Sequence, residues 1–168
     1  CDNLAGARLA VEHLHALGHR RIGHLAGSPQ SLAAADRMLG YRLSLEQHGI
    51  APNPAWLCEI THPGGDSQPL LDMITQLEPP TALFAWSDDV GVWAMRQLRE
   101  KLGLRTPEDV SIIGFDGAPI GDQVTPRLSS IQQPIYAMAT RGVAMLASLI
   151  RGEPLEEPVI AVLGPHNG

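Results

Sequence analysis

Acidic and hydroxyl side chains follow directly after two largely apolar runs of this sequence. Asp116 follows the run 110–115, and Ser87 and Asp88 follow the run 81–86. If folding brings these side chains together, their oxygen atoms could accept hydrogen bonds from the hydroxyl groups of a small ligand. Paired carboxylates could alternatively move protons in an enzyme. In a third interpretation Ser87 or Asp88 caps a helix, because both residue types accept hydrogen bonds from the N–H groups of a first turn.

Arg37 and two tryptophans are further candidates for binding a ligand. Arg37 lies in a segment rich in Ala and Leu. Its planar guanidinium could donate to a ligand hydroxyl or carboxylate, or it could simply be solvated. Trp86 ends an apolar run, so its ring could stack on a sugar or fill the core. Trp93 lies within a predicted helix, which favours packing in the core or at an interface.

Composition argues against several classes of function. The chain has 168 residues, a net charge of −6 and only one lysine, which argues against direct nucleic-acid binding by this segment. Cys1 and Cys58 form no disulfide framework, and neither has metal-ligand spacing with a histidine. No phosphate-cradling glycine loop is present, and no apolar run approaches the roughly 20 residues of a membrane span. We therefore predict no metal, no cofactor and no membrane partner.

Hydrophobic periodicity alternates between the helical and the strand period along the chain. The predicted helices are 3–18, 33–48, 67–77, 87–103 and 135–152, and the predicted strands are 20–27, 57–61, 81–86, 110–116, 128–134 and 157–164. Strands that alternate with helices at this spacing are typical of βαβ units. We therefore expect an α/β fold, a doubly wound and mostly parallel sheet with helices on both faces.

The carboxyl ends of parallel strands meet at one edge of such a sheet, and ligands bind beyond that edge. Asp116 and the pair Ser87-Asp88 come directly after two of the predicted strands. The fold class therefore favours the interpretation in which these side chains share a ligand site.

The order and spacing of six segments resemble the effector-binding part of the lactose/galactose repressor family of transcriptional regulators. The segments are "DN" at 2–3, "HLHALGHRRIGHLAG" at 13–27, "DRMLGYRLSL" at 36–45, "PTALFAWSDDVGVWAMRQL" at 80–98, "PEDVSIIGFDG" at 107–117 and "TPRLSSIQQP" at 125–134. The resemblance implies a periplasmic-binding-protein-like fold of two lobes with a small ligand between them. Closure of the lobes would change the dimer and a DNA-binding headpiece.

The resemblance also implies roles for individual residues. Arg37, Ser87 and Asp116 match ligand-contact positions of the family, and Asp88 and Trp86 lie beside them. Ser67 falls where some members place an aromatic side chain against the ligand. Trp93 lies on a helix that often forms the dimer contact.

The same resemblance predicts how the chain divides into lobes. Residues 1–120 with 157–164 would form the second lobe, and 129–152 would return into the first lobe. Most of the first lobe and the headpiece would precede this sequence, so the chain is expected to be truncated at its N-terminus.

The predicted function is effector sensing by a cytoplasmic, homodimeric regulator. Its expected partners are a small effector, a carbohydrate or a derivative, and DNA that only the headpiece would contact. A periplasmic sugar-binding transport protein is one alternative. An α/β enzyme that uses Asp88 and Asp116 is the other.

Overall fold

The computed structural model describes residues 1–60 and 62–154, and within them five strands form one all-parallel sheet. The strands are β1 (Ile22–Ala26), β2 (Leu57–Glu59), β3 (Ala82–Ala85), β4 (Ser111–Asp116) and β5 (Ser129–Gln132). Their order across the sheet is β2-β1-β3-β4-β5. The predicted strand at 157–164 lies outside the described residues.

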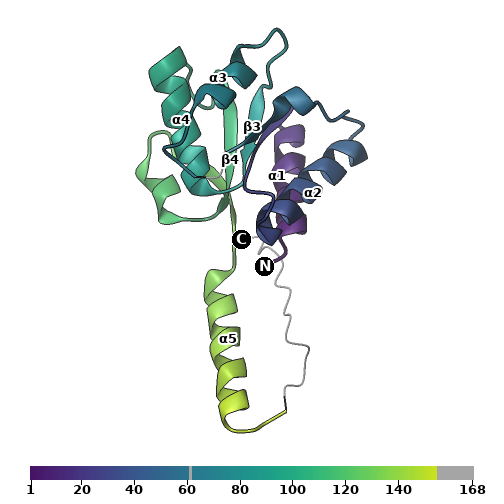
Figure 1. Ribbon diagram of the computed structural model, residues 1–168, viewed down its shortest axis with the longest axis vertical. Coiled ribbons are helices and arrows are strands. Elements are labelled where there is room, and N and C mark those ends of the chain that lie inside the picture. The colour runs from purple at the N-terminus through teal and green to yellow at the C-terminus, as the bar shows by residue number, and fades with distance from the viewer. Residues whose placement is uncertain (61, 155–168) are drawn as a thin grey trace.

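Helices cover both faces of this sheet, which confirms the predicted doubly wound fold class. The helices are α1 (Asn3–Ala16), α2 (Leu32–Gln47), α3 (Gln68–Thr75), α4 (Asp88–Leu102) and α5 (Ile135–Ile150). In Figure 1, α1 and α2 lie on one side of the sheet, and α3 and α4 lie on the other. Two short 3-10 helices, Pro54–Trp56 and Pro119–Gln123, occupy segments that the sequence predicts as loops.

Capping residues set the helix starts close to the predicted positions. Asp2 accepts a hydrogen bond from the backbone N–H of Ala5 at 2.9 Å, and so begins α1. Ser87 accepts from the N–H of Val90 at 3.4 Å, and so begins α4 directly after β3. Because capping side chains satisfy otherwise unpaired N–H groups, they fix where each strand passes into its helix.

Each face of the sheet has its own apolar core. Tyr41, Phe84 and Phe115 lie in the core beneath α1 and α2. Trp93 lies in the core beneath α3 and α4 and is only 8% exposed. The structure therefore uses Trp93 to hold α4 on the sheet and leaves little of its ring for a dimer contact.

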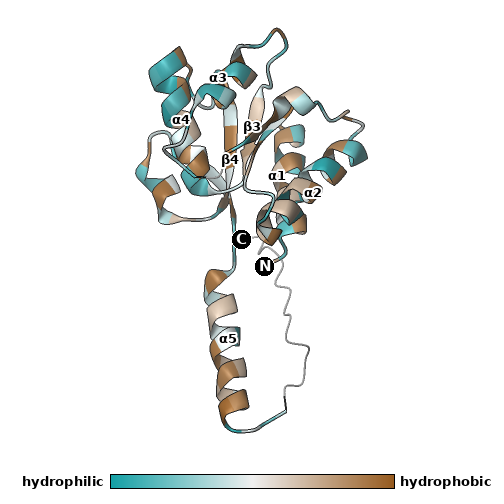
Figure 2. Cartoon of the chain, in the orientation of Figure 1, coloured by the Kyte–Doolittle hydropathy of each residue, from teal (hydrophilic) through white to brown (hydrophobic). Residues whose placement is uncertain are grey.

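The chain leaves the sheet after β5. This strand pairs with β4, so residues 129–132 of the predicted return segment belong to the same sheet as β1–β4. Helix α5 then projects away from the body of the sheet (Figure 1). None of its residues is buried among the described residues, and its surface is mostly apolar (Figure 2).

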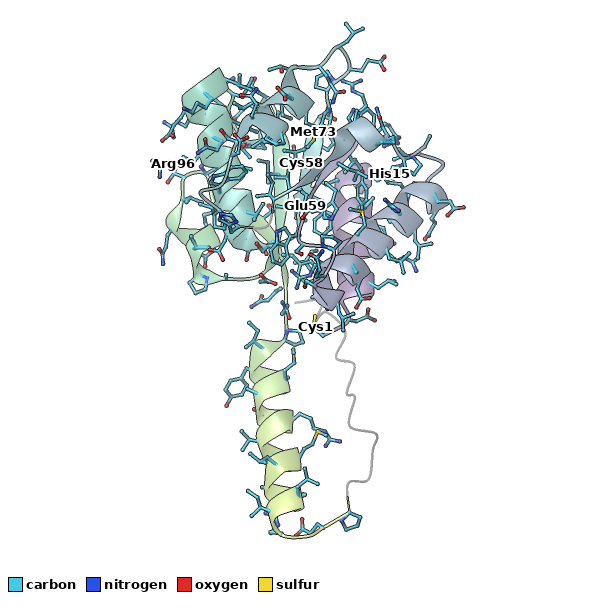
Figure 3. The ribbon with its side chains drawn as sticks, in the orientation of Figure 1. Cys1, His15, Cys58, Glu59, Met73 and Arg96 are labelled. Carbon is cyan, nitrogen blue, oxygen red and sulfur yellow. The ribbon has the colours of Figure 1, made fainter. Side chains whose placement is uncertain are left out.

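The two cysteines lie in different parts of the fold. Cys58 is buried in β2, whereas Cys1 lies at the N-terminal end of the chain (Figure 3). Burial raises the pKa of the Cys58 thiol to about 11, so the reactive thiolate is scarce at neutral pH.

The described residues contain no group of three or more His, Cys, Asp or Glu that could hold a metal ion. In the same part of the chain, no helix combines the length and the apolar character that crossing a bilayer requires.

Candidate functional site

The candidate site lies at the carboxyl edge of the sheet, where β3 and β4 end. Asp116 is the last residue of β4, and Trp86 and Ser87 follow the last residue of β3. These two strands are neighbours in the sheet, so residues from distant parts of the sequence meet at this edge. Arg37 reaches the same edge from α2, which packs on the face occupied by α1.

Arg37 is the centre of the polar contacts at this edge. Its Nη2 lies 3.1 Å from Oδ1 of Asp116, and its Nε donates to Oδ1 of Asn3 at 3.0 Å. Its Nη1 donates to the backbone carbonyl of Trp86. One guanidinium thus joins the start of α1 to the ends of β3 and β4.

Burial and an aromatic face hold the guanidinium in one place. Arg37 is 4% exposed, and its Cζ lies 3.8 Å from the centre of the Phe115 ring. Burial lowers the pKa of Arg37, and the adjacent Asp116 carboxylate raises it again. A guanidinium carries five N–H donors, and the three nitrogen contacts above use three of them. The other two N–H groups of this guanidinium are not part of these contacts.

Asp116 differs from Arg37 because it is accessible. Its side chain is 29% exposed and lines a pocket of about 490 Å³ with Gly117, Gln132 and the first turn of α5. Its backbone φ is +115°, a value that a residue with a Cβ rarely adopts and that functional sites often show. Gln133 donates to Oδ1 of its carboxylate at 2.5 Å.

Ser87 and Asp88 reach the predicted edge, but their side chains are occupied within the fold. Ser87 is 6% exposed and caps α4. Asp88 is fully buried; its Oδ1 accepts from the Ser130 hydroxyl and its Oδ2 from the N–H of Ala118, both at 2.5 Å. Burial raises the pKa of Asp88, and these hydrogen bonds oppose that rise. Asp88 therefore ties α4 to β5 and to the segment after β4.

Trp86 belongs to this cluster through its backbone carbonyl, whereas Ser67 lies at the start of another element, α3. The Trp86 indole N–H donates to the carbonyl of Ile60 at 2.9 Å, and its ring packs over Gly27 while one part stays exposed. Ser67 lies at the start of α3 and makes no side-chain capping bond there. Among the described residues, no hydrogen bond joins Ser67 to Arg37 or Asp116.

Two residues of the cluster are missing from the predicted site. Asn3 belongs to the "DN" motif, and Gln133 belongs to the "QQP" motif, but neither motif says which atoms its side chain meets. Both residues lie where the chain enters or leaves the sheet-and-helix body. The motifs could have indicated them as candidates, and only the fold shows their contacts.

The chain is similar to known regulators over almost its whole length. The sequence profile of the family "Periplasmic binding protein-like domain" matches residues 11–166. The transcriptional regulator CelR of Thermobifida fusca is 34% identical over 167 residues, which is 98% of this chain and 48% of that protein.

Two solved structures have the same fold. One is a complex of the regulator CelR with cellobiose, with a TM-score of 0.85 and 30% identity, covering 93% of this chain and 48% of that one. The other is a sugar-binding regulator of the LacI family from Escherichia coli in complex with phosphate. Its TM-score is 0.85 at 32% identity, covering 94% of this chain and 57% of that one.

These relatives are transcriptional regulators, so the alternatives of a transport protein and of an enzyme that uses Asp88 and Asp116 are set aside. The chain spans about half the length of CelR. It belongs to the LacI family of transcriptional regulators and matches their periplasmic-binding-protein-like domain.

Proposed function

We propose that this chain is the second, C-terminal lobe of an effector-binding domain and that Arg37 and Asp116 bind a carbohydrate or a derivative of one. The ion pair of these two residues at the carboxyl edge of the sheet is the observation that carries the proposal. Asp116 accepts hydrogen bonds from ligand hydroxyl groups, and the two remaining N–H groups of Arg37 donate to them. The solved complex of CelR with cellobiose adds support, because that protein shares the fold.

The other predicted residues have narrower roles in this proposal. The exposed part of Trp86 offers an aromatic face to a sugar ring. Ser87 and Asp88 support the site by fixing α4 and the ends of β4 and β5. Ser67 lies at the start of α3 and is not among the residues that line the pocket beside Asp116.

The mechanism we propose is a shift between open and closed arrangements of two lobes. A first lobe, contributed by the remainder of the regulator and by the segment that includes α5, would cover the carboxyl edge. A ligand that contacts both lobes binds the closed arrangement more tightly, and only this difference in affinity moves the equilibrium. In a cytoplasmic homodimer, the shift would change how a DNA-binding headpiece meets its operator.

Calorimetry on the intact protein tests the proposal with cellobiose, glucose, galactose and ribose as probes. We expect at least one of these sugars to bind, and we expect Asp116→Asn to weaken that binding by roughly tenfold, since hydrogen bonds to a charged group are strong. Asp89→Asn is the matched control, because Asp89 is exposed on α4. Equal affinities of the unaltered protein and the Asp116→Asn variant would remove Asp116 from the site.

A further inference from the structure

We propose that Gln133 is a positioning residue for the Asp116 carboxylate and that it connects the ligand site to the segment by which the chain leaves the sheet. The inference rests on the proposed function, because it concerns how that same site is held and sensed.

The Asp116 carboxylate is held through one of its two oxygens. Gln133 Nε2 donates to Oδ1 at 2.5 Å, and Arg37 Nη2 lies 3.1 Å from the same atom. Two donors from different elements on a single oxygen fix the plane of the carboxylate. Among residues 1–60 and 62–154, the hydrogen bond to this carboxylate is made to Oδ1 and none is made to the other oxygen, Oδ2. The Asp116 side chain is 29% exposed. Oδ2 is therefore the atom that can accept a hydrogen bond from a ligand.

The backbones of the same two residues are joined as well. The N–H of Gln133 donates to the carbonyl of Asp116 at 3.1 Å, so the pair has one main-chain and one side-chain bond. The next residue, Gly117, has φ of +70°, and a Cβ there would come within 2.8 Å of Cγ of Gln132. The end of β4 thus lies directly against the exit from β5, and two hydrogen bonds join them.

Gln133 occupies the exit itself. Strand β5 ends at Gln132 and helix α5 begins at Ile135, so Gln133 and Pro134 form the whole connection between them. The pocket beside Asp116 is lined by this connection and by the first turn of α5. A ligand bound to Oδ2 would therefore contact the anchored carboxylate and the exit segment together.

A neutral amide is suited to this position. It donates to the carboxylate without adding charge, so Arg37 alone balances the charge of Asp116. A glutamate at position 133 would place a second carboxylate on Oδ1, and two carboxylates at that distance cannot both stay ionised without a large cost. The substitution therefore distinguishes an amide that positions Asp116 from a side chain that only fills space.

The test compares Gln133→Leu and Gln133→Glu with the same changes at Gln123, an exposed glutamine that is not among the residues lining the pocket. In the intact protein without added sugar, NMR amide exchange at residues 131–133 and 135 should become faster in Gln133→Leu and stay unchanged in Gln123→Leu. The sugar identified from cellobiose, glucose, galactose and ribose should bind Gln133→Leu roughly tenfold more weakly, as expected on losing a hydrogen bond to a charged group. Gln123→Leu should change the affinity by less than about twofold.

The dependence of sugar affinity on pH separates a positioning role of Gln133 from a merely structural one, which would leave that dependence unchanged. Gln133→Glu should bind the sugar more tightly near pH 5 than near pH 8, because at low pH a shared proton restores the hydrogen bond to Asp116. Gln123→Glu should follow the profile of the unaltered protein.

Several outcomes would overturn the inference. Unchanged amide exchange in Gln133→Leu would show that the exit segment is not held through Asp116, whether or not a sugar binds. Unchanged affinity in Gln133→Leu, or a flat pH profile in Gln133→Glu, would show that Gln133 does not position the carboxylate. Failure of Asp116→Asn to weaken binding would instead contradict the proposed function, so the two failures are distinguishable.

Discussion

Arg37 and Asp116 come from different layers of the fold and meet as an ion pair, with 3.1 Å between Nη2 and Oδ1. Arg37 is supplied by a helix that packs on one face of the sheet, and Asp116 is supplied by the end of a central strand. The arginine is buried and the carboxylate is partly exposed, so the pair presents an anchored acceptor at the edge where ligands bind in such sheets.

Arg37→Ala should lower both ligand affinity and the free energy of unfolding. Its removal leaves Asn3 Oδ1, the Trp86 carbonyl and part of the Asp116 carboxylate without their donor. We expect a loss of roughly 2–4 kcal/mol in urea unfolding, since breaking a buried pair leaves its partners unsatisfied. Arg37→Lys should not restore it, because an ammonium group cannot reproduce three directed contacts of a planar fork.

Arg42→Ala is the control for this change, because Arg42 lies exposed on the same helix. It should alter the free energy of unfolding by less than about 0.5 kcal/mol. If Arg37→Ala were as stable as Arg42→Ala, the contacts of Arg37 would not contribute to the fold.

Arg37 is expected both to bind the ligand and to stabilise the fold, and this double role shows what the sequence alone does not predict. The alternation of periods was enough to predict the sheet, the helices and the edge at which Asp116 lies, because these depend on local patterns and on the handedness of βαβ units. The same pattern gives the residue type at position 37 but not its neighbours, so it does not predict that Arg37→Ala would destabilise the fold. The contact with Asn3 requires α1 and α2 to lie side by side, which only the packed structure shows.

Asp88 and Trp93 illustrate the same limit. The sequence places Asp88 beside the ligand, but the carboxylate turns inward because Ser130 and Ala118 lie within hydrogen-bonding distance of it. Trp93 is placed at a dimer contact by resemblance, and in the structure it packs into the core beneath α3 and α4 and is 8% exposed. In both cases burial depends on residues that are distant in the sequence.

Asp88→Ala should destabilise the fold, whereas Asp89→Ala should not. Asp88 accepts hydrogen bonds from Ser130 and Ala118, and both donors would be left unsatisfied. We expect a loss of about 2–3 kcal/mol for Asp88→Ala by chemical denaturation and about 1 kcal/mol for Ser130→Ala. Asp89 is adjacent in sequence and exposed, so its loss should stay within about 0.5 kcal/mol.

A double-mutant cycle between Asp88 and Ser130 measures the coupling energy of their hydrogen bond, because the effects of substitutions at two residues in direct contact are not additive. A coupling energy near zero would show that the bond between them contributes nothing to stability.

His24 should make the stability of the protein depend on pH below about 6.5. It is fully buried between the rings of Tyr41 and Phe84, its Nδ1 lies 2.8 Å from the Phe84 carbonyl, and its Nε2 has no partner among the described residues. The pKa of His24 is lowered to about 4, chiefly by burial and in smaller part by the charges of Arg37 and Arg42, while the hydrogen bond with the Phe84 carbonyl opposes the shift.

The lowered pKa of His24 determines whether stability rises or falls with pH. The unfolded chain takes up a proton near pH 6.5 while the folded chain resists it, so stability is complete above that pH and falls as the pH drops toward 4. At pH 5 the loss from this residue should be roughly 2 kcal/mol. The measurement is urea unfolding at several pH values for the unaltered protein, His24→Leu and the exposed control His13→Leu. The pH dependence should be weaker in His24→Leu alone, and equal slopes in all three proteins would contradict the assignment.

Helix α5 should cause this chain to self-associate when it is produced alone. Six of its large apolar side chains are each more than half exposed: Ile135, Tyr136, Val143, Leu146, Leu149 and Ile150. Apolar surface of this extent on one element favours association, because burying it removes it from water. Sedimentation velocity over a range of concentrations should show a species larger than the monomer.

The double variant Leu146→Glu/Leu149→Glu should shift the chain toward the monomer, since buried glutamates would need partners. Leu77→Glu is the control, because Leu77 is 99% exposed but lies outside α5. A monomer at every concentration, or equal dissociation by the control, would show that α5 does not drive assembly.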